Sequence, residues 1–176
     1  YIKPGLGISG GNLERDLEVV INLSKKYNLD SQLFQFYKRN SSNFKNWPFE
    51  IFREYFDKKK IIKIFILGLS YKKNTNSTKN SPSLILINKL KKYNKNLQIY
   101  AYDPLVKNFK SSLFNLEKEI NIKNKYDLIF VMNDCDEFKN ISFYKLNKIL
   151  NQKNVVDPFG VMNKYNNKIK NYLSLC

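Results

Sequence analysis

The chain has 176 residues, of which 43% are hydrophobic and 15% aromatic, and this composition favours a globular fold that is large enough to bury a core. Lys and Arg number 31 against 15 Asp and Glu, so the formal net charge is +16 at pH 7. No apolar run approaches the roughly 20 residues that span a bilayer, which argues against a membrane-spanning helix and against a membrane partner.

The positive charge is spread along the chain as single Lys residues and short Lys runs among Asn, Ile, Tyr and Phe. A nucleic-acid-binding module usually concentrates its basic residues on one face, so we do not expect a nucleic-acid partner. A basic nucleic-acid-binding domain is kept as the alternative from another functional class. The chain has no His and two Cys, so neither a metal site nor a disulfide framework is expected, and the predicted location is the reducing cytoplasm.

The first sixteen residues form a glycine-dense loop that leads into an amphipathic helix. The loop glycines are Gly5, Gly7, Gly10 and Gly11. The backbone N–H groups of such a loop, together with the positive end of the following helix dipole, suit a phosphate or another anion. For glycines alone, a tight turn before a helix is the simpler interpretation. Because Tyr1 already lies inside this motif, we expect the chain to be the C-terminal part of a longer protein.

Three of these glycines also spell the GxGxxG pattern of dinucleotide-binding folds. Asp30 follows Gly10 at about the distance where such folds place an acid on the ribose. However, the pattern needs a buried strand directly before it, and only Tyr1 to Pro4 precede Gly5. We therefore interpret this match as accidental.

The segment after the glycine loop is predicted to be helical. Apolar residues recur at helical spacing from Leu13 to Lys26. Asp30 or Ser31 is expected to cap a second helix that breaks near residues 40–43, and Pro48 is expected in the first turn of a third. This region carries more aromatic surface than a short helical arm buries alone, so we expect residues 13–56 to form a homodimer contact.

A second unit is predicted to begin at Ile61–Leu67, a continuous apolar run that is typical of a strand buried on both faces of a parallel sheet. The elements expected after it are a helix opened by Ser81 and Pro82, strands at 97–102 and 127–132, a helix at 143–150 and a short strand at 154–156. Alternating strands and helices predict a parallel sheet with right-handed crossovers. The expected fold class is therefore α/β, with a helical dimerisation segment over 1–60 and a Rossmann-like domain over 61–176.

The glycine loop resembles the active-site loop of the UDP-glucose/GDP-mannose dehydrogenase family, in which a Pro-Gly-x-Gly-x-Gly-Gly run leads to a Cys and then to an Asp. The matching residues are Lys3, Pro4, Gly5, Gly7, Gly10 and Asp16. The loop also departs from the family pattern. Ser9 replaces a glycine, Gly11 replaces a small residue, and Asn12 occupies the position of the nucleophilic cysteine.

Three further stretches are similar to motifs of the same family and follow in the same order, so the resemblance covers nearly the whole chain. They are GLSYKKNTNSTKNSP at 68–82, YAYDP at 100–104 and NDCDEF at 133–138. Two more departures stand out. Lys79 replaces a family arginine, and Phe159 lies in an Asp-Pro-Phe-Gly stretch where the family often has Asp-Gly-Arg-Asn.

The resemblance implies an NAD-dependent nucleotide-sugar 6-dehydrogenase of polysaccharide biosynthesis, with NAD bound mainly by a domain upstream of this chain. Family members oxidise a primary alcohol of the sugar twice and hold the intermediate aldehyde on the cysteine. An asparagine amide is not a nucleophile at neutral pH, so we expect the two-step oxidation to be impaired. A catalytically dead nucleotide-sugar-binding or partner subunit is the alternative.

The resemblance also implies the residues of the site. Asn12 and Asp16 occupy the catalytic positions. The residues expected to bind the nucleotide sugar are Lys3, Gly7, Gly10, Gly11, Tyr71 and Lys72. Residues 7–12 and Lys72 are expected to line one cleft, because they match two motifs of one family.

Overall fold

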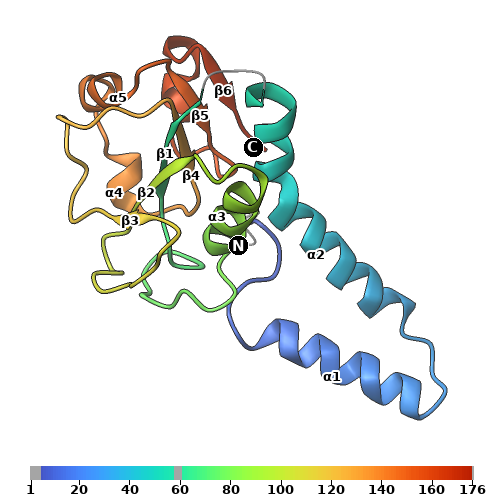
Figure 1. The fold of residues 1–176 in the computed structure, drawn as a ribbon. Coiled ribbons are helices and arrows are strands. Elements are labelled where there is room, and N and C mark those ends of the chain that lie inside the picture. Colours follow the sequence, from blue (N-terminus) through green and yellow to red (C-terminus); the bar gives the residue numbers. More distant parts are fainter. Residues whose placement is uncertain (1–4, 58–60, 176) are drawn as a thin grey trace.

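The computed structural model of the chain describes residues 5–57 and 61–175. A six-stranded parallel sheet with helices on both faces forms the body, and a pair of helices extends from it as an arm (Figure 1). The α/β fold class is therefore confirmed, with the helical segment first and the parallel sheet second. Lys58 to Lys60, where the helical part was expected to end, lie outside the described residues.

The arm consists of α1 (Leu13–Lys26) and α2 (Gln32–Ile51), followed by a short π-helix at Phe52–Phe56. The first helix has the predicted bounds. Ser31 is the N-cap residue of α2, and the Asp30 carboxylate accepts a hydrogen bond from the Gln32 N–H at 2.8 Å. In Figure 1, α1 and the first half of α2 project away from the sheet, whereas the second half of α2 runs alongside it.

The predicted break in this region is wrong, because α2 runs through residues 40–43 and Pro48 lies inside it. The Asn and Ser residues there are weak helix formers. A tertiary contact offsets this weakness, since the Ser41 hydroxyl is buried and accepts a hydrogen bond from the Ile8 N–H at 2.7 Å. Pro48 is also buried, and the change to π-helical geometry begins four residues after it.

The sheet has the strand order β3-β2-β1-β4-β5-β6, and all its pairings are parallel. The strands are β1 (Lys63–Leu67), β2 (Gln98–Tyr102), β3 (Asn115–Leu116), β4 (Leu128–Val131), β5 (Asn154–Val156) and β6 (Asn171–Leu173). The helices of this part are α3 (Pro82–Tyr93), α4 (Asp136–Lys139), α5 (Phe143–Ile149) and a 3-10 helix at Asn163–Lys168. Four strands were predicted within two residues of their bounds. The two edge strands, β3 and β6, were not predicted, because each is too short to show a pattern.

Alternating side chains of each central strand enter two different cores. On β1, Ile64 and Ile66 belong to the core under α3, whereas Phe65 and Leu67 belong to the core under α4 and α5. Burial of both faces explains the unbroken apolar run in the sequence. The sheet is therefore held rigidly between two helical layers, and its carboxyl edge can position a site.

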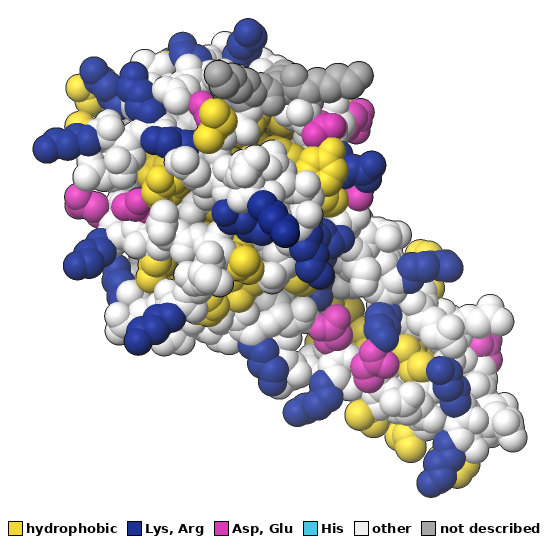
Figure 2. All heavy atoms as spheres, in the orientation of Figure 1, with side chains coloured by type: hydrophobic (Ala, Val, Ile, Leu, Met, Phe, Trp, Pro, Cys, Tyr) yellow, Lys and Arg dark blue, Asp and Glu magenta, His cyan; other side chains and the backbone are white. Residues whose placement is uncertain are grey.

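The surface matches the even spread of positive charge in the sequence. Figure 2 shows Lys and Arg side chains scattered over the visible face of both the body and the arm, with Asp and Glu between them. Within residues 5–57 and 61–175, no helix has the length and apolar character needed to cross a membrane.

Candidate functional site

A cleft of about 580 Å³ lies at the carboxyl edge of the sheet. Its walls come from the glycine loop, from the segments that follow β1, β4 and β5, and from the start of α3. The lining residues are Gly5, Leu6, Gly7, Ile8, Ser9, Leu13, Tyr71, Lys72, Pro82, Asn133, Asp134 and Phe159. The structure therefore brings Lys72 and the first part of the glycine loop together across about sixty residues of sequence.

The position of the cleft follows from the strand order. The chain moves outward from β1 through β2 to β3, and then returns to the other side of β1 to add β4. Open α/β sheets bind ligands at the carboxyl ends of the two strands that flank such a reversal, because the loops there diverge and leave a crevice. Lys72 follows β1 and Asn133 follows β4, so the cleft occupies this place.

The carboxylate of Asp103 fixes the loop that carries Lys72. Asp103 directly follows β2, and only 2% of its surface is exposed. Its Oδ2 atom accepts hydrogen bonds from the Leu69 N–H, the Ser70 N–H and the Ser70 hydroxyl at 2.8 to 2.9 Å. The Asn133 amide of the next loop also donates to the Ser70 hydroxyl, at 3.0 Å. One buried carboxylate thus holds the loops after β1 and β4 in a fixed relation.

Gly68 permits this close approach. Its φ is +95°, a region that favours glycine, and a Cβ on it would stand 2.6 Å from the Asn133 side chain. The loop after β1 therefore turns directly against the loop after β4, and the floor of the cleft is closed by packed polar groups.

Two neighbouring lysines of the loop after β1, Lys72 and Lys73, differ in their ion pairing. The Lys72 ammonium lies 5.5 Å from the centre of the Tyr71 ring, and its side chain is exposed. Lys73 is paired with Asp134 at 3.7 Å and with Asp136 at 3.8 Å. Within residues 5–57 and 61–175, no carboxylate pairs with Lys72, so this lysine is the cation of the cleft lining that is available to an anion.

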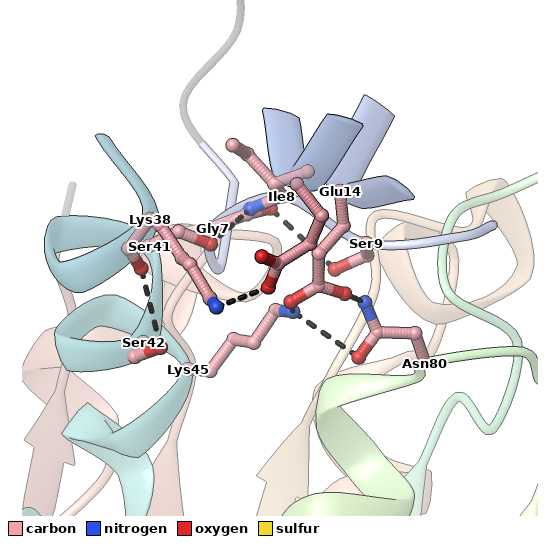
Figure 3. A network of polar contacts seen from close by, with 10 residues as sticks. Gly7, Ile8, Ser9, Glu14, Lys38, Ser41, Ser42, Lys45 and Asn80 are labelled. Carbon is pink, nitrogen blue, oxygen red and sulfur yellow. Dashed lines mark hydrogen bonds and ion pairs between the residues drawn. The ribbon is translucent and has the colours of Figure 1, made fainter. Parts of the chain in front are cut away.

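The glycine loop is anchored on α2 through Ser41. The Ile8 N–H donates to the Ser41 hydroxyl, and a Cβ on Gly7 would stand 2.4 Å from the Ser41 carbonyl oxygen (Figure 3). Gly7 also has a φ of +72°. A side chain at this position would both strain the backbone and collide with α2, so the loop requires glycine here.

The next two glycines pack against the loop after β1. A Cβ on Gly10 would stand 3.0 Å from the Tyr71 ring, and one on Gly11 would stand 2.8 Å from the Lys79 side chain. Tyr71 is therefore held between the glycine loop and the cleft. Gly10 and Gly11 pack against the Tyr71 and Lys79 side chains and do not line the cleft.

The two residues that were predicted to occupy catalytic positions, Asn12 and Asp16, do not line the cleft. Asn12 is the N-cap residue of α1, is exposed, and makes no side-chain capping hydrogen bond. Asp16 lies one turn further along and pairs with Arg15 at 3.1 Å on the exposed surface. Leu13, the first residue of α1, does line the cleft, so Asn12 and Asp16 lie next to the cleft on the exposed side of the helix start. Lys3 lies outside the described residues.

One loop with an acidic residue and one aromatic ring complete the lining, and their residues were not among the site residues predicted from the sequence. Asn133 and Asp134 form one wall, and Phe159 forms another. Their signals were present in the NDCDEF match and in the altered Asp-Pro-Phe-Gly stretch. Neither signal shows from sequence alone that the residues meet Lys72.

Asp157 holds Phe159 in place. The Asp157 carboxylate is fully buried, and it accepts hydrogen bonds from the Met162 N–H at 2.6 Å, the Tyr172 hydroxyl at 2.7 Å and the Phe159 N–H at 3.3 Å. Burial raises the pKa of Asp157, while these hydrogen bonds act in the opposite direction. The turn that presents Phe159 is therefore rigid.

The two cysteines were not predicted to take part in the site. Cys135 packs beside the core under α4, and burial raises the pKa of its thiol, which keeps it protonated and weakly nucleophilic. Cys176 lies outside the described residues. Among the residues that the structure describes, no group of three or more His, Cys, Asp and Glu side chains is arranged to hold a metal ion.

The parallel sheet, its strand order and the cleft at its switch point define a Rossmann-like domain. A sequence model of the UDP-glucose/GDP-mannose dehydrogenase family, UDP binding domain, matches residues 65–164, which is more than half of the chain. The chain therefore belongs to the UDP-glucose/GDP-mannose dehydrogenase family.

Individual relatives agree with this assignment. The chain is 27% identical to UDP-N-acetyl-D-mannosamine dehydrogenase of Pyrococcus horikoshii over 163 aligned residues. This alignment covers 90% of the chain and 36% of the relative. The chain is 28% identical over 142 residues to UDP-glucose 6-dehydrogenase of Campylobacter jejuni, covering 80% of the chain and 35% of the relative. The chain thus spans little more than a third of the length of these curated relatives.

Solved structures show the same fold. A UDP-glucose dehydrogenase from Pyrobaculum islandicum superposes with a TM-score of 0.78 at 16% identity, over 96% of this chain and 38% of that one. A GDP-mannose dehydrogenase from Pseudomonas aeruginosa superposes with a TM-score of 0.77 at 19% identity, over the whole of this chain and 41% of that one. The likeness includes the helical arm, since it extends over nearly all of the chain.

Proposed function

We propose that the cleft at the carboxyl edge of the sheet binds a nucleotide sugar, and that the chain serves as the nucleotide-sugar-binding part of an NAD-dependent 6-dehydrogenase in polysaccharide biosynthesis in the cytoplasm. The observation that carries the proposal is the meeting of Lys72 with the glycine loop in a cleft at the strand-order reversal. Family membership gives the ligand class, because the matched domain is described as UDP binding.

Ligand recognition rests on groups that suit a phosphate. Lys72 supplies a positive charge, and Gly5 and Gly7 supply backbone that a ligand can approach without meeting a side chain. Ser9 and the Asn133 region add polar groups for the ribose or the sugar. NAD is not required for this step, and we propose that it binds mainly to a domain outside the chain.

Asn12 favours a second form of the same function, a binding or partner subunit without dehydrogenase activity. A thiolate holds the aldehyde for the second hydride transfer in the chemistry that the family resemblance implies, and an amide does not form that bond. As such a subunit, the protein binds the nucleotide sugar but does not catalyse its complete oxidation to the acid.

We further propose that the arm forms a homodimer contact. Several large apolar side chains of α1, α2 and their connection are more than 40% exposed: Leu13, Val19, Leu23, Leu29, Leu33, Phe36, Tyr37 and Phe44, together with Tyr27. The arm projects from the body, so these side chains have little of the chain to pack against (Figure 1). A second copy would cover them.

The test of the binding function is calorimetric titration with UDP-glucose and GDP-mannose at physiological salt. Replacing Lys72 with Ala removes a charge-assisted contact and is expected to weaken binding about tenfold or more. Lys118→Ala, which changes an exposed lysine outside the cleft, serves as the matched control and should leave the affinity unchanged.

Two results would overturn the proposal. One is the absence of binding to either nucleotide sugar at millimolar concentration. The other is tight, sequence-selective binding of DNA or RNA at physiological salt, which would establish the nucleic-acid-binding alternative.

A further inference from the structure

The aromatic ring of Phe159 occupies an unusual place in the cleft. It is only half buried, although it packs against the core under α3, and the rest of it lines the cleft. The buried carboxylate of Asp157 holds its loop, so the exposed part of the ring is presented in a fixed position.

The cleft lining that follows β1 differs in chemistry from the lining that follows β5. Lys72 follows β1 and carries a positive charge, whereas Phe159 follows β5 and is apolar. The strand β4 lies between β1 and β5, so the ends of these two strands are about 10 Å apart, which is two spacings between neighbouring strands. A nucleotide bridges such a distance, with its phosphates at one end and its base at the other.

Tyr71 is less suited to hold a base. A Cβ on Gly10 would touch its ring, and the Lys72 ammonium lies 5.5 Å from its centre. The glycine loop and a lysine thus already occupy the surroundings of this ring. Phe159 comes from the segment after β5, and Leu6, Leu13 and Pro82 also contribute apolar side chains to the lining.

We propose that Phe159 is a ligand-binding residue that holds the base of the nucleotide by stacking, while Lys72 binds its phosphates. This inference rests on the proposed nucleotide-sugar site and adds the orientation of the ligand within it. Stacking on an aromatic ring tolerates any base, because every base has a planar face. The site is therefore expected to depend on the presence of a base more than on its identity.

The test measures the dissociation constants of UDP, which has a base, and of pyrophosphate, which has none. Phe159→Leu keeps an apolar side chain against the core and removes the flat ring. We expect it to weaken UDP binding about fivefold or more, as loss of base stacking does, and to change pyrophosphate binding less than about twofold. Phe159→Tyr keeps a ring and should bind UDP as the native protein does.

Phe109→Leu is the matched control. Phe109 is also a half-buried phenylalanine that packs against the same core, and it does not line the cleft. This change should leave the affinity for UDP unaltered. A cooperative thermal transition in each variant shows that the fold is retained.

The outcomes separate this inference from the proposed function. If the native protein binds UDP and Phe159→Leu binds it equally well, the stacking role is wrong and the nucleotide site stands. An equal loss of UDP and pyrophosphate binding, or the same loss in Phe109→Leu, also overturns the stacking role. If the native protein binds neither UDP nor UDP-glucose, both the inference and the proposed function fail.

Discussion

The Lys45 ammonium lies 3.4 Å from a carboxylate oxygen of Glu14, and only 6% of the Lys45 side chain is exposed. It also donates to the amide oxygen of Asn80 at 3.2 Å, and the Asn80 amide donates to Glu14 (Figure 3). These three residues belong to α2, α1 and the segment before α3. The buried Lys45 ammonium therefore links the two helices of the arm, α1 and α2, to the sheet domain.

Replacing Lys45 with Met should destabilise the fold by about 1 to 3 kcal/mol, because it removes the buried ammonium that neutralises Glu14 and donates to Asn80. Water reaches Glu14, whose side chain is 36% exposed. The expected loss in the free energy of unfolding is therefore smaller than for a fully buried ion pair. Urea unfolding measures the change. Adding Glu14→Gln to this variant should recover part of the loss, since it removes the unpaired charge.

The matched control for Lys45 is Lys38→Met. Lys38 pairs with Glu18 between the same two helices, but both side chains are more than 40% exposed. Exposed pairs contribute little, so the expected loss is below about 1 kcal/mol. Equal losses in the two variants would contradict the role of burial at Lys45.

The acid stability of the sheet should depend on Asp127. Burial acts to raise its pKa, but hydrogen bonds from the Lys63 N–H, the Asn151 amide and the Ile62 N–H outweigh it, and the pKa lies below its usual value. The ionised form is therefore favoured in the folded state. Its contribution is complete above the unfolded-state pKa of about 3.9 and is lost as the pH falls through the lower folded-state pKa.

Asp127→Asn removes this titration. We expect the free energy of unfolding to fall less steeply below about pH 4 in the variant than in the native protein, although the variant is less stable at pH 7. Urea unfolding at pH 7, 4 and 3 measures both effects. Asp30→Asn, which changes an exposed carboxylate on the arm, is the control. Parallel pH profiles for the native protein and Asp127→Asn would show that the linkage is absent.

The dimer contact can be tested at the exposed end of the arm. Leu33 is 58% exposed and Phe36 is 49% exposed, and both line a hollow of about 670 Å³ on α2. Changing both to Ser should weaken self-association at least tenfold without unfolding the chain, because apolar area is lost only in the dimer. Sedimentation at micromolar concentration measures the association.

Tyr144→Ser is the control for the dimer test, because Tyr144 is 66% exposed on α5, which lies away from the arm. This change should leave association unaltered. A native protein that sediments only as a monomer would refute the contact.

The chemistry at Asn12 predicts a gain of function. In a protein that joins this chain to an NAD-binding domain, the native sequence should bind the nucleotide sugar but produce the acid far more slowly than about 1 per second, a rate typical of enzymes. Asn12→Cys should increase both NADH formation and acid product. Asn12→Ser, with a weaker nucleophile, should gain little. Rapid acid formation by the native protein would show that Asn12 does not occupy the nucleophile's position.

The sequence determined the class of fold and most of its elements. The helix at Leu13–Lys26 and the central strands were predictable because a half-buried helix and a doubly buried strand each impose their own apolar period. Ser81 and Pro82 likewise marked the start of α3, and the Ser81 hydroxyl accepts a hydrogen bond from the Ser83 N–H. These signals are local, so a single chain carries them.

Only the tertiary structure decided how the site is assembled. Phe159, Asn133 and Lys72 are far apart in the sequence, and they meet because β5, β4 and β1 lie side by side in the sheet. The same holds for Ser41, whose weak helix propensity predicted a break, while its contact with the glycine loop keeps α2 continuous. Contacts between distant segments outweigh local preference, since burial and paired hydrogen bonds are worth more than the few tenths of a kcal/mol that separate most helix propensities.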